Sequence, residues 1–340
     1  MGRLCYLSRA YRNGTSAGNK AKSDYEDILV AHGAVNLGLR RSYGGGKARI
    51  FLRNLVGVAR FALGVRRGDT VVLQYPVKKY FRLLCGVARL RGARTVALVH
   101  DLGSWRRRAL TVAQELKRLG HADVVAATNG VMADWLVGKG FPAGKTCALG
   151  LHDYLSEARP AARVPQDLTD VTYAGALNLR KNSFLLEMKE LQSIHVELYG
   201  ELRDYEPEHI RVHGFVEPDD FIRSAQGAWG LVWDGDSLDS CTGAWGEYLS
   251  VNTPHKSAFY LRAGLPLIVW SGSALAGIVR ERGIGVCVDS LRELPELLGS
   301  ISAERYGAMR RAALAEGEKA ARGGNLTALL EAQGLVNSTE

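Results

Sequence analysis

Short runs of β-branched residues alternate with helical stretches along this chain, and this alternation constrains the fold more than any other feature of the sequence. In the first half, the runs DTVVLQY, RTVALVH and ADVVAAT are separated by segments with apolar residues at helical spacing. Buried parallel strands joined by crossover helices produce such a pattern. The predicted strands are Asp69–Tyr75, Arg94–His100 and Ala122–Thr128, and the predicted helices are Ala109–Leu119 and Gly130–Gly138.

The same alternation restarts in the second half after a break. Residues 156–170 (SEARPAARVPQDLTD) are rich in proline and charge and lack periodicity, as expected of an interdomain crossover. A chain of 340 residues is long enough for two domains with separate cores. We therefore expect an α/β protein with domains at residues 1–155 and 156–340, the last of which ends in a fraying helix and tail after Ala321. The predicted strands of the second domain are Val171–Gly175, Val196–Tyr199, Trp229–Trp233, Leu267–Trp270 and Gly285–Val288.

The chain carries a formal net charge of +9, and much of the excess lies in its first half. Basic proteins commonly bind phosphates, nucleic acid or anionic lipid. No recognition helix, zinc finger or RNA-binding aromatic signature occurs, so nucleic acid is not an expected partner. Two interpretations stay open: solvated helix faces, or a peripheral contact with anionic headgroups. The basic clusters are Arg40-Arg41, Arg66-Arg67, Lys78-Lys79, Arg89 with Arg91, and Arg106-Arg107-Arg108 beside Trp105.

The sequence favours a cytoplasmic protein, placed at the inner face of the membrane if the headgroup contact is made. It has no apolar run of about 18 residues, and its first twenty residues lack the apolar stretch of a secretory signal. The cysteines are scattered and odd in number, so neither a disulfide framework nor a zinc site is predicted. They are Cys5, Cys85, Cys147, Cys241 and Cys287.

Polar residues that directly follow strands are the candidates for chemistry, because ligands of open parallel sheets bind beyond the carboxyl ends of the strands. In the first half, Asp101 closes a buried strand and is a candidate general base for an acceptor hydroxyl, with His100 as the competing candidate. The alternative is that Asp101 only caps the helix that follows. The rule also selects Gln74, Thr128-Asn129, Tyr199-Gly200 and Asp234.

A helix start in the segment 248–264 is the clearest signal for a bound anion. Thr253 is a good N-cap and Pro254 a good first helical residue, and Gly264 predicts the stop, so we expect a helix at Pro254–Ala263.

The first turn of this predicted helix contains His255 and Lys256, although the helix dipole disfavours positive side chains there. A bound diphosphate would resolve the conflict. The alternative is that Lys256 extends into water.

Two further segments carry charged residues after strands. The loop that ends in Arg180 and Lys181 follows a predicted strand, where either residue could bind a phosphate, although loop cations are often merely solvated. The triplet Asp234-Gly-Asp236 has the spacing of a metal motif but equally suits a turn, so we assign no metal. Motifs of the dinucleotide-binding, P-loop and nucleophile-elbow types are missing from the sequence, which leaves a nucleotide sugar as the favoured ligand.

The sequence resembles the GT-B glycosyltransferases of the glucosyltransferase 3 and β-1,6-galactofuranosyltransferase type. The most specific stretch is NTPHKSAFYLRAGLPLIVW at residues 252–270, followed by GIGVCVDSL at 283–291. Shorter matches are VVLQYP at 71–76, VHD at 99–101, ADVVAATN at 122–129, YAGAL at 173–177, HGFVEPDDF at 213–221 and GLVWDG at 230–235.

The resemblance implies two Rossmann-like parallel-sheet domains that face a central cleft and bind a UDP-sugar without a cofactor or metal. It also makes a homo-oligomer an expectation. The basic first half suggests a saccharide acceptor at the membrane, such as a polyprenyl-diphosphate-linked glycan, with a glycoprotein acceptor as the alternative. Two glutamates that the wider retaining GT-B enzymes place eight residues apart fall here on Val251 and Phe259, so that pattern does not transfer.

The same resemblance implies roles for particular residues. Asn252 and Lys256 would bind the pyrophosphate, with Arg180 or Lys181 assisting, and Tyr199 and Gly200 would lie near the nucleoside. The loop with Gly14, Thr15 and Ser16 would close over the sugar and the acceptor, and Tyr248 and His255 complete the nucleotide-sugar candidates. The alternatives left open are a UDP-sugar epimerase and a non-catalytic partner subunit of the same fold.

Overall fold

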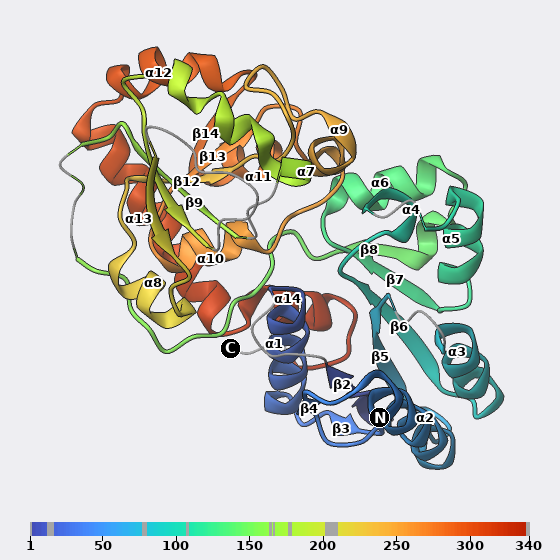
Figure 1. Ribbon diagram of the computed structural model, residues 1–340. Helices are drawn as coiled ribbons and strands as arrows, with labels where there is room; N and C mark the ends of the chain where they lie inside the picture. The colour runs from blue at the N-terminus through green and yellow to red at the C-terminus, as the bar shows by residue number, and fades with distance from the viewer. Residues whose placement is uncertain are drawn as a thin grey trace. The chain divides into compact units, whose positions relative to one another are not determined.

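The computed structural model divides the chain into two compact units, coloured along the sequence in Figure 1. The first unit comprises residues 1–153 and 323–340, and the second comprises residues 154–322. The structure describes residues 2–11, 17–76, 80–106, 109–162, 165, 167–175, 179–200 and 210–337.

The first unit is built on a parallel sheet in the order β3-β1-β5-β6-β7-β8. The three predicted strands are confirmed as β5, β6 and β7, whose side chains are almost all buried because helices pack on both faces of the sheet. Strands β2 and β4 pair in a separate two-stranded parallel sheet. The bounds are β1 Leu4–Tyr6, β2 Ala10–Tyr11, β3 Val35–Asn36, β4 Ser42–Tyr43, β5 Thr70–Tyr75, β6 Arg94–Val99, β7 Val124–Ala127 and β8 Thr146–Ala148.

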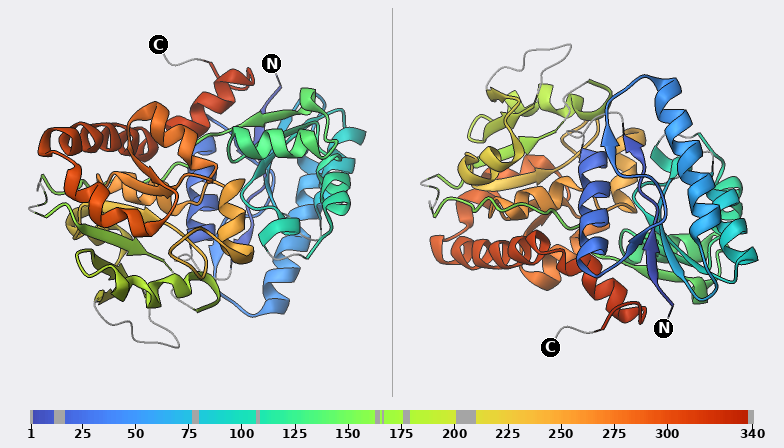
Figure 2. Two further views of the ribbon diagram at one scale, coloured as in Figure 1. Left: turned by 90° about the horizontal axis from the view of Figure 1, so that it is seen from above. Right: turned by 90° about the horizontal axis from the view of Figure 1, so that it is seen from below.

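Helix α2 (Lys47–Gly64) packs against α3 (Phe81–Leu90) and is the long light-blue helix in both views of Figure 2. The predicted helix at Ala109–Leu119 begins later, as α5 (Val112–Leu119), because Thr111 and Gln114 form a capping box there. The prediction for Gly130–Gly138 is confirmed as α6, which Asn129 caps. The remaining helical segments of this part are α1 Ala17–Ala31, α4 Gly103–Arg106 and η1 Ala143–Lys145.

The C-terminal segment corrects the predicted domain division and the predicted fraying tail. From Gly323 onward the chain belongs to the first unit, although we predicted all of residues 156–340 in the second. Helix α14 (Gly324–Ala332) lies beside α1 (Figure 1), and the Asp153 carboxylate accepts the backbone N–H groups of Asn325 and Leu326 at 3.0 and 2.7 Å. A buried carboxylate that caps the helix N-terminus in this way fixes the segment in place.

The second unit contains a parallel sheet in the order β11-β10-β9-β12-β13-β14. All five predicted strands of this half are confirmed, with ends shifted by one residue at most, and β11 is a strand that the sequence pattern did not reveal because its side chains are largely exposed. The bounds are β9 Asp170–Ala174, β10 His195–Tyr199, β11 Ile210–Gly214, β12 Trp229–Val232, β13 Leu267–Trp270 and β14 Gly285–Val288.

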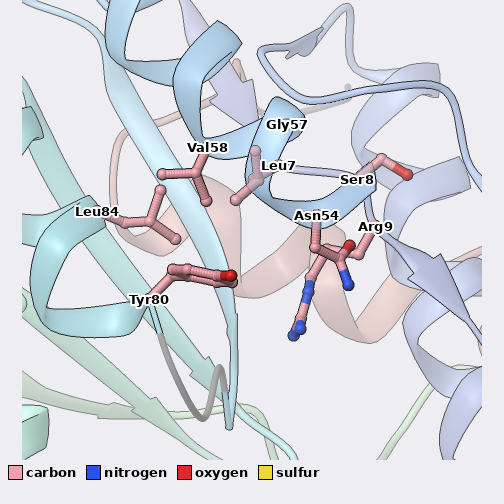
Figure 3. A pocket seen from close by; sticks show the side chains of 8 residues that line it. All are labelled: Leu7, Ser8, Arg9, Asn54, Gly57, Val58, Tyr80 and Leu84. Carbon is pink, nitrogen blue, oxygen red and sulfur yellow. The ribbon is translucent and has the colours of Figure 1, made fainter. Parts of the chain in front are cut away.

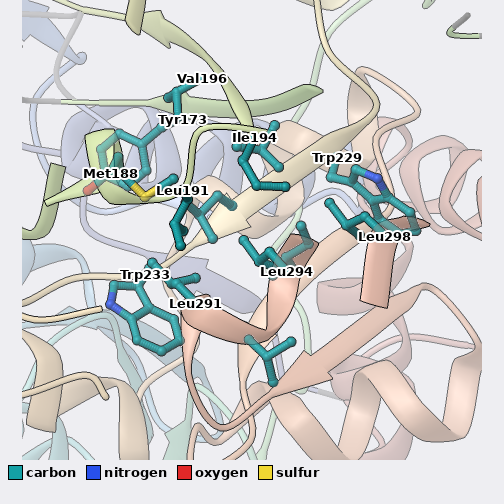
Figure 4. Close-up of a cluster of buried hydrophobic side chains, with 14 of the residues drawn as sticks. Tyr173, Met188, Leu191, Ile194, Val196, Trp229, Trp233, Leu291, Leu294 and Leu298 are labelled. Carbon is teal, nitrogen blue, oxygen red and sulfur yellow. The ribbon is translucent and has the colours of Figure 1, made fainter. Parts of the chain in front are cut away.

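Aliphatic side chains together with large aromatic ones fill the core of the second unit, as Figure 4 shows. Trp229 and Trp233 are fully buried, and their indole N–H groups donate to the carbonyls of Leu168 and Ser237 at 2.8 and 3.0 Å, so both indole N–H groups are satisfied. The helical segments around this sheet are α7 Leu179–Asn182, η2 Ser183–Leu186, η3 Met188–Glu190, α8 Pro218–Ser224, α9 Gly243–Gly246, η4 Glu247–Ser250, α10 Lys256–Arg262, α11 Leu275–Arg282, η5 Leu291–Glu293, α12 Leu294–Ser300 and α13 Ala303–Ala321.

A close contact between β12 and α10 holds the end of β9 in place. A Cβ atom on Gly230 would lie 2.4 Å from the ring of Tyr260, so only glycine allows α10 to approach β12 this closely. The Tyr260 hydroxyl then accepts the backbone N–H of Ala174, the last residue of β9, at 2.7 Å. Among the described residues, no helix is long and apolar enough to cross a bilayer.

Candidate functional site

Helix α10 begins two residues later than the sequence indicates. It spans Lys256–Arg262 with His255 at the N-cap position, whereas we predicted a helix from Pro254 with Thr253 as its cap. The Pro254 carbonyl accepts both the backbone N–H and the hydroxyl of Ser257, at 3.0 and 2.8 Å, so this proline begins a turn that leads into the helix. The predicted stop is confirmed at Gly264, whose φ of 69° suits glycine.

Lys256 lies at the carboxyl edge of the second sheet, where it meets a carboxylate. Its Nζ donates to Asp234 Oδ1 at 3.0 Å and to the Trp233 carbonyl at 3.1 Å. Lys181 approaches the same carboxylate oxygen, at 3.5 Å. Two lysines from α10 and α7 thus share one aspartate that follows β12, and together they leave one positive charge in excess. We call Lys181, Asp234 and Lys256 the lysine–aspartate cluster.

Two neighbours fix the geometry of the lysine–aspartate cluster. The Tyr173 hydroxyl donates to Asp234 Oδ1 at 2.9 Å and accepts from Asn182 Nδ2 at 3.1 Å. The Tyr173 ring also lies under Lys256, with Nζ 4.5 Å from its centre, a distance at which an ammonium is attracted to the aromatic face. The backbone N–H of Gly235 donates to the Lys181 carbonyl at 2.7 Å and holds α7 beside the loop after β12.

Burial and mutual charge set the protonation of the cluster. Burial alone would raise the pKa of Asp234, but the nearby Lys181 and Lys256 hold that pKa below its ordinary value. Burial lowers the pKa of Lys256 to about 8, although Asp234 acts to raise it. Lys256 is therefore an ammonium at neutral pH that releases its proton readily, and an anion bound beside it would raise its pKa.

Buried polar atoms without partners mark the same edge of the sheet. Among the described residues, Asn252 Oδ1 and Ser273 Oγ are buried and make no hydrogen bond. Asn252 lies two residues after the end of η4, and Ser273 lies three residues after the end of β13. Buried polar groups in native proteins are usually hydrogen-bonded, so these two atoms have the character of ligand contacts. Asn252 was a predicted site residue, whereas Ser273 was not.

The other predicted nucleotide-sugar residues are distributed around this edge. Arg180 is exposed, and among the described contacts it is Lys181 that joins the cluster. His255 packs against the Tyr154 ring at 5.2 Å, and Tyr248 is buried on η4.

The predicted nucleoside residues Tyr199 and Gly200 end β10. The Tyr199 ring stacks on His213 at 4.4 Å, and its hydroxyl accepts the Gln226 N–H at 2.8 Å, so the side chain serves packing in this structure. Gly200 has a φ of 141°, a backbone conformation that favours glycine.

In the first unit, His100 is held by its neighbours at the carboxyl edge of the sheet. The Gln74 side-chain amide donates to the Lys22 carbonyl at 2.9 Å, which turns Gln74 Oε1 toward His100 Nε2 at 2.8 Å. His100 Nε2 therefore carries the proton. The His100 ring stacks on Tyr25, and the Tyr25 hydroxyl bonds to His152 Nδ1 at 2.6 Å.

Asp101 is half-buried and lies just before α4. Glu115, which is fully buried, accepts the backbone N–H groups of Gly103 and Ser104 at 2.9 and 2.6 Å. The capping of α4, which was the alternative role for Asp101, is thus carried out in large part by Glu115. Gly14, Thr15 and Ser16 lie outside the described residues.

The carboxylates of the Asp234-Gly-Asp236 triplet have partners in the protein. Asp234 lies between two lysines, which disfavours a divalent cation, and Asp236 accepts the Thr242 hydroxyl. Elsewhere in the described chain, Asp167, Asp170 and His195 lie close enough to share a metal ion. They lie at the amino ends of β9 and β10, the edge opposite to the lysine–aspartate cluster.

Comparison with known proteins gives matches in both halves of the chain. The family model described as "Glucosyltransferase 3-like, N-terminal domain" matches residues 4–151, and "Glucosyltransferase 3-like, C-terminal domain" matches residues 171–332. The beta-1,6-galactofuranosyltransferase WbbI of Escherichia coli (strain K12) is 31% identical over 292 residues, which cover 84% of this chain and 82% of WbbI. Glucosyltransferase 3 of Streptococcus gordonii is 24% identical over 246 residues, which cover 70% of this chain and 71% of that protein.

Among solved structures, Anabaena Alr3699/HepE in complex with UDP and glucose aligns with a TM-score of 0.60 at 12% identity. The alignment covers 98% of this chain and all of HepE. At this identity the likeness shows the fold: two Rossmann-like parallel sheets in one chain.

Proposed function

Since the chain belongs to the glucosyltransferase 3-like family of glycosyltransferases, we propose that it transfers a hexosyl group from a UDP-sugar to a saccharide hydroxyl. The observation that carries the proposal is the lysine–aspartate cluster at the carboxyl edge of the second GT-B sheet. The hexosyl group is of the glucosyl or galactofuranosyl type, as the names of the two relatives indicate for those proteins.

The donor diphosphate binds beside Lys256 and Lys181 in this proposal. The cluster keeps one positive charge in excess while Asp234 holds both ammonium groups in place. As the bond to the anomeric carbon breaks, negative charge develops on the departing diphosphate, and fixed ammonium groups stabilise that charge without reorganising. Asn252 and Ser273 supply hydrogen bonds to the polar groups of the donor.

The reaction needs no metal ion or cofactor in this proposal. Many phosphate-transfer sites neutralise the diphosphate with Mg²⁺ held by carboxylates. Here the carboxylate nearest to the proposed diphosphate is already neutralised by lysines, and the lysines supply the compensating charge.

The first unit provides the acceptor side. If the transfer inverts the anomeric centre, Asp101 removes the proton from the acceptor hydroxyl as it attacks. His100, with its Nε2 proton fixed by Gln74, then positions the acceptor. If the transfer retains the configuration, Asp101 only orients the acceptor.

The protein contacts an anionic membrane through α2, where it meets a lipid-linked acceptor. Basic residues flank an exposed apolar stripe on this helix, an arrangement typical of helices that lie in the headgroup region. Arg41, by contrast, already forms an ion pair with Asp27 at 2.9 Å. The exposed apolar residues are Phe51, Leu52, Leu55, Val56 and Leu63, and the basic ones are Lys47, Arg49, Arg53 and Arg60. A homo-oligomer is proposed on the family resemblance alone, and light scattering would measure it.

Calorimetric titration with UDP, UDP-glucose and UDP-galactofuranose tests the proposal, with and without magnesium. The wild type is expected to bind at least one of these ligands equally well in both conditions, and Lys256→Ala is expected to lose binding. Arg305→Ala is the matched control, because it removes an exposed positive charge of α13 that is not among the candidate site residues. A wild-type protein that binds none of the ligands would overturn the proposal and favour a non-catalytic partner subunit.

A further inference from the structure

A pocket of the first unit lies beside α2 (Figure 3). The segment after β1 forms one wall, α2 forms a second, and the start of α3 forms a third. The lining residues that matter here are Arg9, Asn54 and Tyr80.

Arg9 is a half-buried cation whose guanidinium has no hydrogen bond or ion pair with any described residue. Burial lowers its pKa, although Tyr11, Tyr80 and Glu26 act to raise it. Glu26, the carboxylate that acts on Arg9, accepts the Ser8 and Tyr11 hydroxyls at 2.6 and 2.8 Å and lies 3.7 Å from Arg41 Nη1. A desolvated charge without a partner destabilises the folded state, so a protein retains one where a ligand supplies the missing charge.

Tyr80 provides an independent observation in the same pocket. Its hydroxyl is buried and makes no hydrogen bond, and in Figure 3 the hydroxyl end of its ring points toward the side of the pocket where Asn54 and Arg9 lie. Asn54 Oδ1 already accepts the Ala10 N–H at 3.1 Å, which leaves the Asn54 amide N–H groups for other partners. The polar groups offered to a ligand are therefore hydrogen-bond donors. A set of donors that includes a guanidinium fits an oxyanion.

The position of Arg9 connects this pocket with the acceptor residues of the same unit. Arg9 also lines a second pocket, whose wall includes Lys22 and Gln74. Gln74 bonds in turn to His100. An anion at Arg9 thus lies on the side of the unit where we propose that the acceptor binds.

We propose that Arg9, Tyr80 and Asn54 bind a phosphate group of the acceptor. This inference rests on the proposed function, because it names the chemical class of acceptor that the enzyme takes: a saccharide carried on a phosphate or diphosphate ester. Arg9 forms the charge-assisted contact, and Tyr80 and Asn54 donate to further phosphate oxygens. Free phosphate offers the same chemistry, so the experiment must distinguish the two sources.

Calorimetric titration of the full chain with inorganic pyrophosphate, in the presence of saturating UDP, tests the proposal. UDP occupies the nucleotide site, so that pyrophosphate reports on another site. Arg9→Gln is expected to weaken pyrophosphate binding roughly ten- to a hundredfold, and Tyr80→Phe about five- to tenfold. Arg94→Gln is the matched control, because it removes an exposed arginine at the amino end of β6 and is expected to bind like the wild type.

A second titration with farnesyl diphosphate identifies the source of the phosphate. Tighter binding of farnesyl diphosphate than of pyrophosphate, lost in Arg9→Gln, supports an acceptor-borne phosphate, whereas equal affinities indicate a free-anion site and overturn the acceptor assignment. Unchanged pyrophosphate binding in both Arg9→Gln and Tyr80→Phe overturns the site itself, and so does a loss of UDP affinity in Arg9→Gln. If UDP fails to bind the wild type, the proposed function fails instead, so the two failures are distinguishable.

Discussion

The ion pair between Asp234 and Lys256 is expected to make a large energetic contribution, which a double-mutant cycle can measure. The perturbations are Asp234→Asn, Lys256→Met and the double variant. At a separation of 3.0 Å, two unit charges attract each other by about 5 kcal/mol at an effective dielectric constant of about 20. Desolvation offsets part of this attraction, so we expect a coupling energy of about 2–3 kcal/mol.

The single variants differ in what each leaves behind. Lys256→Met leaves Asp234 with Lys181 and Tyr173, so its cost is expected to be about 2–3 kcal/mol. Asp234→Asn leaves two ammonium groups without a counterion, which costs about 3–5 kcal/mol unless Lys256 loses its proton. The pKa of Lys256 is about 8 even with Asp234 present. Deprotonating Lys256 at pH 7 therefore costs only about 1.4 kcal/mol, because each unit by which the pKa exceeds the pH adds about that much.

Urea unfolding measures these costs through tryptophan fluorescence, because four of the six tryptophans (Trp229, Trp233, Trp245 and Trp270) belong to the second unit. The pH dependence adds a second readout. The lowered pKa of Lys256 means that the unfolded chain binds this proton more tightly, so stability rises with pH from about 8 toward about 10.5. Asp234→Asn lowers that pKa further, and its stability deficit is expected to shrink between about pH 7 and 8. Additive single costs, with a coupling below about 0.5 kcal/mol, would refute the reasoning.

Three further outcomes are expected. Asp101→Asn should lower kcat by about 10²–10⁴-fold while leaving the Kd for UDP unchanged, measured as UDP release with a panel of saccharide acceptors; an unchanged kcat would exclude Asp101 as the base. Asp153→Ala should remove the cap of α14 and cost about 1–3 kcal/mol, seen as faster amide exchange in α14, and unaltered exchange there would contradict the capping role. Gly230→Ala should force its new Cβ against Tyr260 and destabilise the second unit by about 1–3 kcal/mol in thermal unfolding, whereas an unchanged Tm would show that the contact can relax.

The sequence predicted the buried strands of both sheets because a parallel strand covered on both faces is a continuous apolar run. The strands that it missed lack this signature. β1 and β8 have three residues each, β3 has two, and β11 is largely exposed. A strand of two or three residues, or one whose side chains are mostly exposed, has no apolar pattern that the sequence can reveal.

The candidate site was predicted in part, for a reason that its contacts make plain. Lys256 stood out because a lysine at a helix start conflicts with the helix dipole. Its partner Asp234 lies 22 residues away and Tyr173 much further, and only the order of β9 and β12 in the sheet brings them together. The same holds for Asp153, whose contact with Asn325 spans 172 residues. The sequence could not reveal this contact, and for that reason we predicted a fraying tail where the structure has a capped helix.

Proton uptake on UDP binding tests most directly the claim that Lys256 holds the donor diphosphate. Titrations at about pH 8.5, in buffers of different ionisation enthalpy, measure the protons taken up per bound UDP. Because Lys256 has a pKa of about 8 and an adjacent diphosphate raises it, the account expects an uptake of up to about 0.7 proton in the wild type and none in Lys256→Met if that variant retains measurable binding. A binding enthalpy that is the same in every buffer, or an uptake that persists in Lys256→Met, would contradict the account.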